Sequence, residues 1–233
     1  MPRLGDLQVN IVGSGNTALV LMHGFGAPGD DLVALSEMLG GVREGMRFVF
    51  PEAPIALDSF FGESRAWWMI DVGRFERALQ TGDVEVLISE EPQGLAAARQ
   101  KMLGCLDALE REHGISSDRV VIGGFSQGAM LATDLVLRSS RPFAGLVVLS
   151  GTMLAKPAWL SAMRLHPGFP VFQSHGKLDP LLPHLVAVSL RDAFIAAGIA
   201  VEFVDFMGAH EIPPRVLSKL RGFLERLAIP RPR

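Results

Sequence analysis

Short apolar runs rich in valine, isoleucine and leucine alternate along the chain with longer stretches in which apolar residues recur every three or four positions. The short runs predict buried strands, and the longer stretches predict amphipathic helices. We expect strands at residues 8–12, 18–22, 47–50, 119–122, 145–149, 171–174 and 201–205. We expect helices at residues 31–39, 94–113, 127–138, 185–197 and 213–227.

Strands that alternate with helices predict crossover connections and a sheet whose strands are mostly parallel. Continuously apolar runs, such as residues 120–122 and 146–149, fit strands buried on both faces. The fold class that we expect is therefore α/β, a mostly parallel twisted sheet with helices on both faces. A chain of 233 residues fits one such domain over residues 1–233.

One segment, residues 51–92, interrupts the alternation. It is rich in proline, glycine and aromatic residues. Long irregular stretches inside a compact domain are usually functional or disordered, and the aromatic content argues against disorder. We therefore expect a long, functional, aromatic-containing loop here.

A nucleophile motif lies between an expected strand and an expected helix. Residues 124–128 read G-F-S-Q-G. In this setting the G-x-S-x-G pattern is typical of a nucleophile elbow, a strained turn that lifts the serine hydroxyl above the sheet and needs glycine where backbones crowd. We predict that Ser126 is the nucleophile and that the amide N–H of Gln127 faces a developing oxyanion.

A serine hydroxyl needs a base, and the base needs an acid that orients it. In chains with this elbow the acid and then the histidine follow the serine. Asp179 and His210 each come shortly after an expected strand. Because the carboxyl ends of parallel strands meet at one edge of a sheet, we predict that Asp179 orients His210 and that His210 is the base.

A glycine-rich loop follows the second expected strand. Residues 24–29, G-F-G-A-P-G, match the dinucleotide-binding pattern G-x-G-x-x-G, and Glu52 stands roughly where a ribose-binding acid would be expected. A nicotinamide-dependent oxidoreductase is therefore an alternative, although Pro28 stands where the helix of that motif should be running. In a serine hydrolase the same loop supplies a second oxyanion donor, for which we predict the amide of Phe25 beside that of Gln127.

Composition narrows the alternatives. Hydrophobic residues make up 48% of the chain and the net charge is −3, which provides no basic surface for nucleic acid. No apolar run approaches the ~20 residues of a transmembrane helix, and residues 1–6 lack the apolar part of a signal peptide, so we expect a cytoplasmic protein without a transmembrane segment. The single cysteine, Cys105, excludes an internal disulfide and lies at helical spacing among apolar neighbours, which predicts a buried packing role.

Six short motifs are spread over most of the chain. They are L-M-H-G-F-G at 21–26, R-A-W-W-M-I-D at 65–71, G-G-F-S-Q-G-A at 123–129, L-S-G at 149–151, H-G-K-L-D-P-L-L-P at 175–183 and G-A-H-E-I at 208–212. Together they resemble the phospholipase/carboxylesterase family, the small bacterial esterases and acyl-protein thioesterases. The resemblance implies the α/β-hydrolase fold, a triad of Ser126, Asp179 and His210, and oxyanion donors from Phe25 and Gln127. It also implies no metal or organic cofactor and a homodimer.

The chain departs from the family pattern next to Trp68 and in the stretch that follows, where the acyl group of a substrate would be held. The aromatic cluster of this region fits an acyl pocket. We expect Phe61, Trp68 and Leu182 to contact the substrate and Trp67 to anchor the loop to the core.

The sequence therefore predicts a serine esterase that hydrolyses carboxylic esters or thioesters through an acyl-enzyme, with a small-molecule or lipid acyl ester as substrate. Two alternatives stay open: the nicotinamide-dependent oxidoreductase, and a hydrolase-like scaffold that binds a partner without catalysis. The acyl-chain length and the choice between ester and thioester also stay open.

Overall fold

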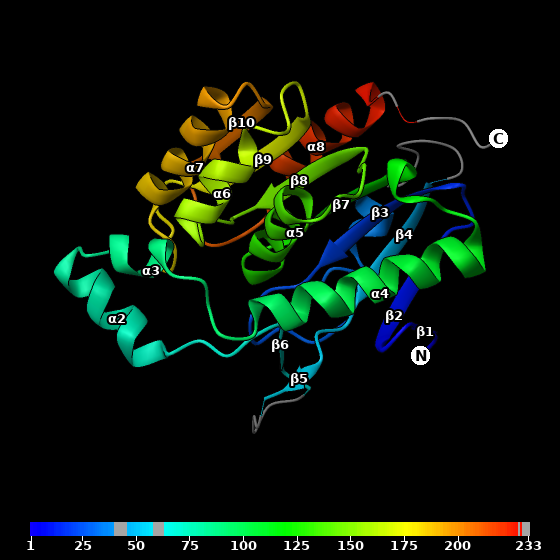
Figure 1. Ribbon diagram of the computed structural model, residues 1–233, viewed down its shortest axis with the longest axis horizontal. Helices are drawn as coiled ribbons and strands as arrows, with labels where there is room; N and C mark the ends of the chain where they lie inside the picture. Colours follow the sequence, from blue (N-terminus) through cyan, green and yellow to red (C-terminus); the bar gives the residue numbers. More distant parts are fainter. Residues whose placement is uncertain (40–45, 58–62, 228, 230–233) are drawn as a thin grey trace.

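The computed structural model describes residues 1–39, 46–57, 63–227 and 229 (Figure 1). Ten strands and the connecting helices follow one another in the part of the chain that it describes. The strands are β1 (Arg3–Leu4), β2 (Leu7–Val12), β3 (Thr17–Met22), β4 (Met46–Pro51), β5 (Ile55–Ala56), β6 (Arg65–Ala66), β7 (Val120–Phe125), β8 (Gly145–Leu149), β9 (Pro170–Gly176) and β10 (Ala200–Phe206). The helices are α1 (Leu35–Met38), α2 (Val72–Thr81), α3 (Glu85–Ser89), α4 (Leu95–His113), the 3₁₀ turn η1 (Ser117–Arg119), α5 (Gln127–Arg138), α6 (Lys156–Met163), α7 (His184–Ala196) and α8 (Pro214–Arg226).

Eight strands form one sheet in the order β1-β2-β4-β3-β7-β8-β9-β10, and β5 pairs with β6 in a small separate sheet. From β4 to β10 every neighbouring pair is parallel, whereas β1–β2 and β2–β4 are antiparallel. The expected mostly parallel sheet is confirmed, and all seven predicted strands are present. Because the strands run parallel, their carboxyl ends lie together at one edge of the sheet, where sites of open α/β sheets form.

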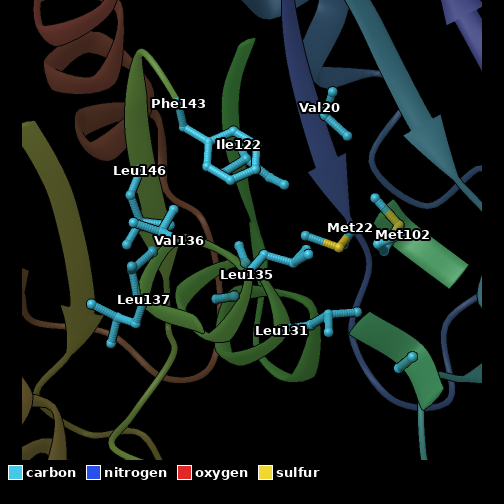
Figure 2. Packing of buried hydrophobic residues seen from close by; sticks show 14 of the residues in the cluster. Val20, Met22, Met102, Ile122, Leu131, Leu135, Val136, Leu137, Phe143 and Leu146 are labelled. Atoms are coloured by element: carbon cyan, nitrogen blue, oxygen red, sulfur yellow. The ribbon is translucent and has the colours of Figure 1, made fainter. Parts of the chain in front are cut away.

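Helices cover both faces of this sheet (Figure 1). The buried side chains of α4 to α7 pack on one face, and those of α1 and α8 pack on the other. Figure 2 shows part of the first layer, in which Met22 of β3, Met102 of α4 and Leu135 of α5 lie among buried neighbours. A sheet covered in this way buries both faces of its strands, which explains their continuously apolar sequences.

Helix α4 shows how the pattern of residues decides local structure. Its buried residues recur every three or four positions, so they share one face against the sheet. Gly94 before the helix and Gly114 after it both have positive φ, 97° and 66°, which glycine adopts without strain. The amide of Gly114 donates to the carbonyl of Glu110 and ends the helix. No helix in the described part of the chain combines the length and hydropathy of a membrane-spanning segment.

Two helices differ from the expectation. The helix predicted at 31–39 is reduced to the single turn α1, because several amides of this stretch, such as those of Asp31 and Val33, donate to the carbonyl three positions earlier and close turns instead of a helix. Helix α6 was not predicted, although Pro157 stands at its start, a position that suits proline.

The prediction of an irregular loop over residues 51–92 is wrong for its second half. Residues Val72–Thr81 and Glu85–Ser89 form α2 and α3, which project beside the sheet (Figure 1). Asp71 caps α2 by accepting a hydrogen bond from the amide of Arg74 at 2.9 Å, and Gly82 ends the helix with a φ of 72°. Both end signals are local, so the sequence carries evidence for this helix.

Candidate active site

Ser126 stands in a strained turn between β7 and α5. Its φ and ψ are 54° and −118°, a conformation that non-glycine residues rarely adopt. The amide of Ser126 donates to the carbonyl of Leu149 at 2.9 Å, and the serine carbonyl accepts the first amide bonds of α5. A Cβ at Gly128 would lie 2.1 Å from the Met22 carbonyl oxygen, so only glycine lets the helix approach β3 this closely. The motif therefore builds the elbow that the sequence predicts.

Asp179 and His210 meet at the neighbouring ends of β9 and β10. The Nδ1 atom of His210 lies 2.6 Å from Oδ2 of Asp179. The other carboxylate oxygen, Oδ1, accepts hydrogen bonds of 2.9 Å from the amides of Leu181 and Leu182. A Cβ at Gly176 would lie 2.1 Å from the carbonyl oxygen of Ala209, so this glycine allows the acid loop and the base loop to touch.

The environment of Asp179 stabilises its charged form. Burial alone would raise the pKa of this carboxyl, but the hydrogen bond with His210 and those from the amides of Leu182 and Leu181 outweigh it, and the pKa is lowered. The carboxylate is therefore a permanent hydrogen-bond acceptor at neutral pH, which keeps the proton of His210 on Nδ1. The opposite nitrogen, Nε2, is left to accept a proton.

Ser126 and His210 face the same space. Both line one cavity of about 1040 Å³. Phe125, directly before the serine, contacts the histidine, with ring centroids 4.6 Å apart. The structure thus brings the three residues of the predicted triad to one edge of the sheet from three separate loops.

The glycine-rich loop after β3 lies against the nucleophile. A Cβ at Gly24 would be 3.3 Å from Cβ of Ser126, and the next residue, Phe25, lines the cavity. Among the described residues, the amides of Phe25 and Gln127 have no hydrogen-bond partner. Strand β6 holds this loop, because Gly26 donates to the carbonyl of Arg65 at 2.8 Å. Two amides beside the nucleophile are thus available to an oxyanion.

His23 fixes the same loop through hydrogen bonds of its ring. Its Nδ1 donates to the carbonyl of Gly24 at 2.8 Å, and its Nε2 accepts from the amide of Ala53 at 3.1 Å. Burial lowers the pKa of His23, against the opposing effect of the Gly24 carbonyl, so the ring stays neutral. The indole N–H of Trp67 donates to the His23 carbonyl at 3.0 Å. His23 is thus a structural residue that fixes the loop.

The side chain of Gln127 joins the elbow to the segment after β6. Its Oε1 accepts from the amide of Trp67 at 2.9 Å, and its Nε2 donates to the carbonyl of Trp68 at 2.8 Å. This pair of bonds sets Trp68 in the cavity wall and leaves Trp67 buried in the core. The sequence prediction gave Gln127 only its backbone role and missed this contact.

The lining of the cavity is largely apolar and includes several charged residues. Trp68 and Leu182 line it, so both are placed to contact a substrate, and that contact stays a prediction. Phe61 lies outside the described residues. Further apolar wall residues, which no sequence pattern indicated, are Val84, Leu87, Ile88, Met130, Met153, Leu154 and Val186. The charged lining residues are Asp31, Asp71, Arg74, Glu90 and Glu91.

The geometry of residues 24–29 does not suit a dinucleotide. The chain after this loop continues in turns, so no helix N-terminus faces the place where a pyrophosphate would bind. Glu52 pairs with Arg65 at 2.6 Å and packs against Gly29, so its carboxylate is already paired and is not free to bind a ribose hydroxyl. The loop instead lies against Ser126 and lines the cavity.

Cys105 is buried in the core, as predicted, and burial raises the pKa of its thiol to about 12. It takes no part in the cavity. Within the residues that the structure describes, no cluster of three or more His, Cys, Asp or Glu side chains could hold a metal ion.

The strand order and the strained serine between β7 and α5 are those of the α/β-hydrolase fold, and the chain is a hydrolase of this fold. The family model of Phospholipase/Carboxylesterase matches residues 13–228. The chain therefore belongs to the phospholipase/carboxylesterase family.

Individual proteins agree with this assignment. Acyl-protein thioesterase 1 of Neurospora crassa is 26% identical over 97% of this chain and 94% of its own length. Acyl-protein thioesterase 1 of Kluyveromyces lactis is 30% identical over 71% of this chain and 70% of its own length. Among solved structures, esterase PE8 superposes with a TM-score of 0.79 at 24% identity, covering 95% of this chain and 99% of its own. A carboxylesterase from Mesorhizobium loti has a TM-score of 0.74 at 17% identity, covering 97% and 98%.

Proposed function

We propose that the protein is a serine esterase that hydrolyses carboxylic esters or thioesters, with Ser126 as nucleophile, His210 as base and Asp179 as orienting acid. The observation that carries the proposal is the 2.6 Å contact between His210 and Asp179, with His210 lining the same cavity as Ser126. Relatives named acyl-protein thioesterase and carboxylesterase support the class of reaction.

The first half of the reaction forms an acyl-enzyme. His210 Nε2 takes the proton of the Ser126 hydroxyl as Oγ attacks the carbonyl carbon of the substrate. The charge that forms on the carbonyl oxygen is stabilised by the free amides of Phe25 and Gln127, and by the N-terminus of α5. His210 then gives its proton to the leaving alcohol or thiol, and the acyl group stays on Ser126.

The second half releases the acid. His210 takes a proton from water, the water oxygen attacks the acyl carbon, and the proton returns to Ser126 as the carboxylic acid leaves. The apolar side of the cavity, formed by Trp68, Leu182 and α3, is the place we assign to the acyl chain. A cytoplasmic location and a homodimer also stay predictions, which cell fractionation and sedimentation velocity would test.

The test is the hydrolysis of p-nitrophenyl esters by Ser126→Ala. We expect kcat to fall by at least ~10³-fold, because the residual rate comes from binding and oxyanion contacts alone. Ser139→Ala is the matched control, since Ser139 stands at the other end of α5, where its hydroxyl donates to the Leu135 carbonyl. Turnover by Ser126→Ala at the rate of the control would sink the proposal.

Two further assays separate the alternatives. A fluorophosphonate probe should label the wild type quickly and Ser126→Ala not at all, whereas a scaffold without catalysis would not react. Rates for p-nitrophenyl esters and acyl-thioesters of increasing chain length would define the preferred substrate.

A further inference from the structure

A second histidine contacts the acid of the triad. His175 lies at the end of β9 with its side chain fully buried. Its Nε2 is 2.8 Å from the carbonyl oxygen of Leu182 and 3.3 Å from Oδ2 of Asp179, the oxygen that also meets His210. Nothing in the sequence pattern assigns His175 a part in the site.

The contacts of His175 determine which of its ring nitrogens carries the hydrogen. The Leu182 carbonyl can only accept, so the hydrogen of His175 is on Nε2 and the ring donates. The buried Nδ1 has no partner in the described part of the protein. Burial lowers the pKa of His175, against the opposing effects of the Leu182 carbonyl and the Asp179 charge, so the ring is neutral. It is a fixed donor.

These bonds close a ring around the acid loop. His175 donates to the carbonyl of Leu182 and faces Oδ2 of Asp179, while the amide of Leu182 donates to Oδ1 of the same carboxylate. The side chain of Leu182 lines the cavity. One imidazole therefore contacts both the carboxylate of Asp179 and the backbone of Leu182, a residue that lines the cavity.

We propose that His175 is a positioning residue for the reaction, which aims Oδ2 of Asp179 at His210 and fixes Leu182 at the substrate cavity. The inference rests on the proposed function. His175 itself does not line the cavity, so it acts through Asp179 and does not touch the substrate.

Other titratable groups lie near His175 and Asp179. His184 of α7 lies with its ring centroid 6.2 Å from that of His175. Asp205 at the end of β10 pairs with Lys177 at 2.9 Å. These groups are unchanged in sequence in every variant below, so a change in kcat reports on residue 175.

The experiment compares substitutions that differ in where they place an N–H. The amide nitrogen of glutamine reaches the position of Nε2, whereas that of asparagine stops near Nδ1. His175→Gln should keep kcat for a p-nitrophenyl ester within about threefold of wild type. His175→Asn and His175→Leu should lower kcat by about 10²-fold, the effect of a misplaced catalytic group.

Rescue by glutamine is the readout that loss of packing alone would not give. If His175 only filled space, the polar variants His175→Gln and His175→Asn should lose activity together. The proposed role requires that His175→Gln keeps kcat while His175→Asn and His175→Leu lose it, because only glutamine places an N–H at the position of Nε2. If His175→Leu fails to fold, the comparison of His175→Gln with His175→Asn still tests the inference.

Wild-type rates in His175→Asn, or equal losses in the Asn and Gln variants, would overturn the inference. Failure of the proposed function looks different, because then Ser126→Ala would keep its activity whatever stands at position 175.

Discussion

Asp179→Asn tests how the site fixes the proton of His210. In the carboxylate, Oδ1 accepts from the amides of Leu181 and Leu182, while Oδ2 meets His210. An asparagine has one oxygen, and we expect it to stay with the two amides. Its NH₂ group would then point at His210, which forces the ring proton onto Nε2, where it blocks transfer from Ser126.

The size of the effect follows from the two orientations of the amide. Turning the oxygen toward His210 would leave the buried N–H of Leu182 unsatisfied, at about 1–3 kcal/mol, and would lose the part-buried bond of Leu181, at about 0.5–1.5 kcal/mol. The unproductive orientation is therefore favoured by about 1.5–4.5 kcal/mol. At about 1.36 kcal/mol per tenfold, kcat should fall by about 10-fold to about 2000-fold.

The assay is kcat for a p-nitrophenyl ester, measured together with the thermal unfolding of each variant. The matched control is Asp205→Asn, since Asp205 ends the neighbouring strand and pairs with Lys177 away from the cavity. We expect the control to keep kcat within about threefold. A folded Asp179→Asn protein with the kcat of the control would refute the reasoning about the tautomer.

Three further outcomes are expected. Gly128→Ala should lower the free energy of unfolding by about 1–3 kcal/mol in a urea titration, because its Cβ would meet the Met22 carbonyl, whereas Gly104→Ala, with nothing within 4 Å, should raise it by up to about 1 kcal/mol. Cys105, 1% exposed and with a pKa of about 12, should react with a disulfide reagent only after unfolding, and fast labelling of the native protein would contradict its burial. The lowered pKa of Asp179 contributes stability above the unfolded pKa of about 3.9 and loses it as pH falls through the folded value, so the unfolding midpoints of wild type and Asp179→Asn should converge below that pH; a constant gap would speak against the linkage.

The sequence by itself determined the seven predicted strands, four of the five predicted helices and the elbow. Apolar runs and helical spacing are local properties, and they predicted the order of strands and helices because each element buries its own pattern. The elbow is equally local: a serine held between β7 and α5 with glycine two positions on each side can turn in few ways. The ends of α2, at Asp71 and Gly82, were just as readable and were missed.

The arrangement of the acid and the base could be predicted only to the extent that the topology of the sheet determines it. The carboxyl ends of parallel strands meet, so Asp179 and His210 were expected at one edge of the sheet. That the pair closes to 2.6 Å, and that His175 shares the same carboxylate oxygen, depends on side-chain directions that no pattern in the chain records.

Only the tertiary structure decided the cavity. Its walls come from Trp68, from α3, from Met153 and Leu154 after β8, and from Val186 of α7, which are far apart in sequence. Trp68 was predicted from the sequence to contact the substrate. The other residues read as ordinary apolar positions, since burial in a core and exposure to a cavity require the same side chains. The cavity forms because the folded sheet holds their elements around one serine, and that geometry is a property of packing between elements rather than of any one of them.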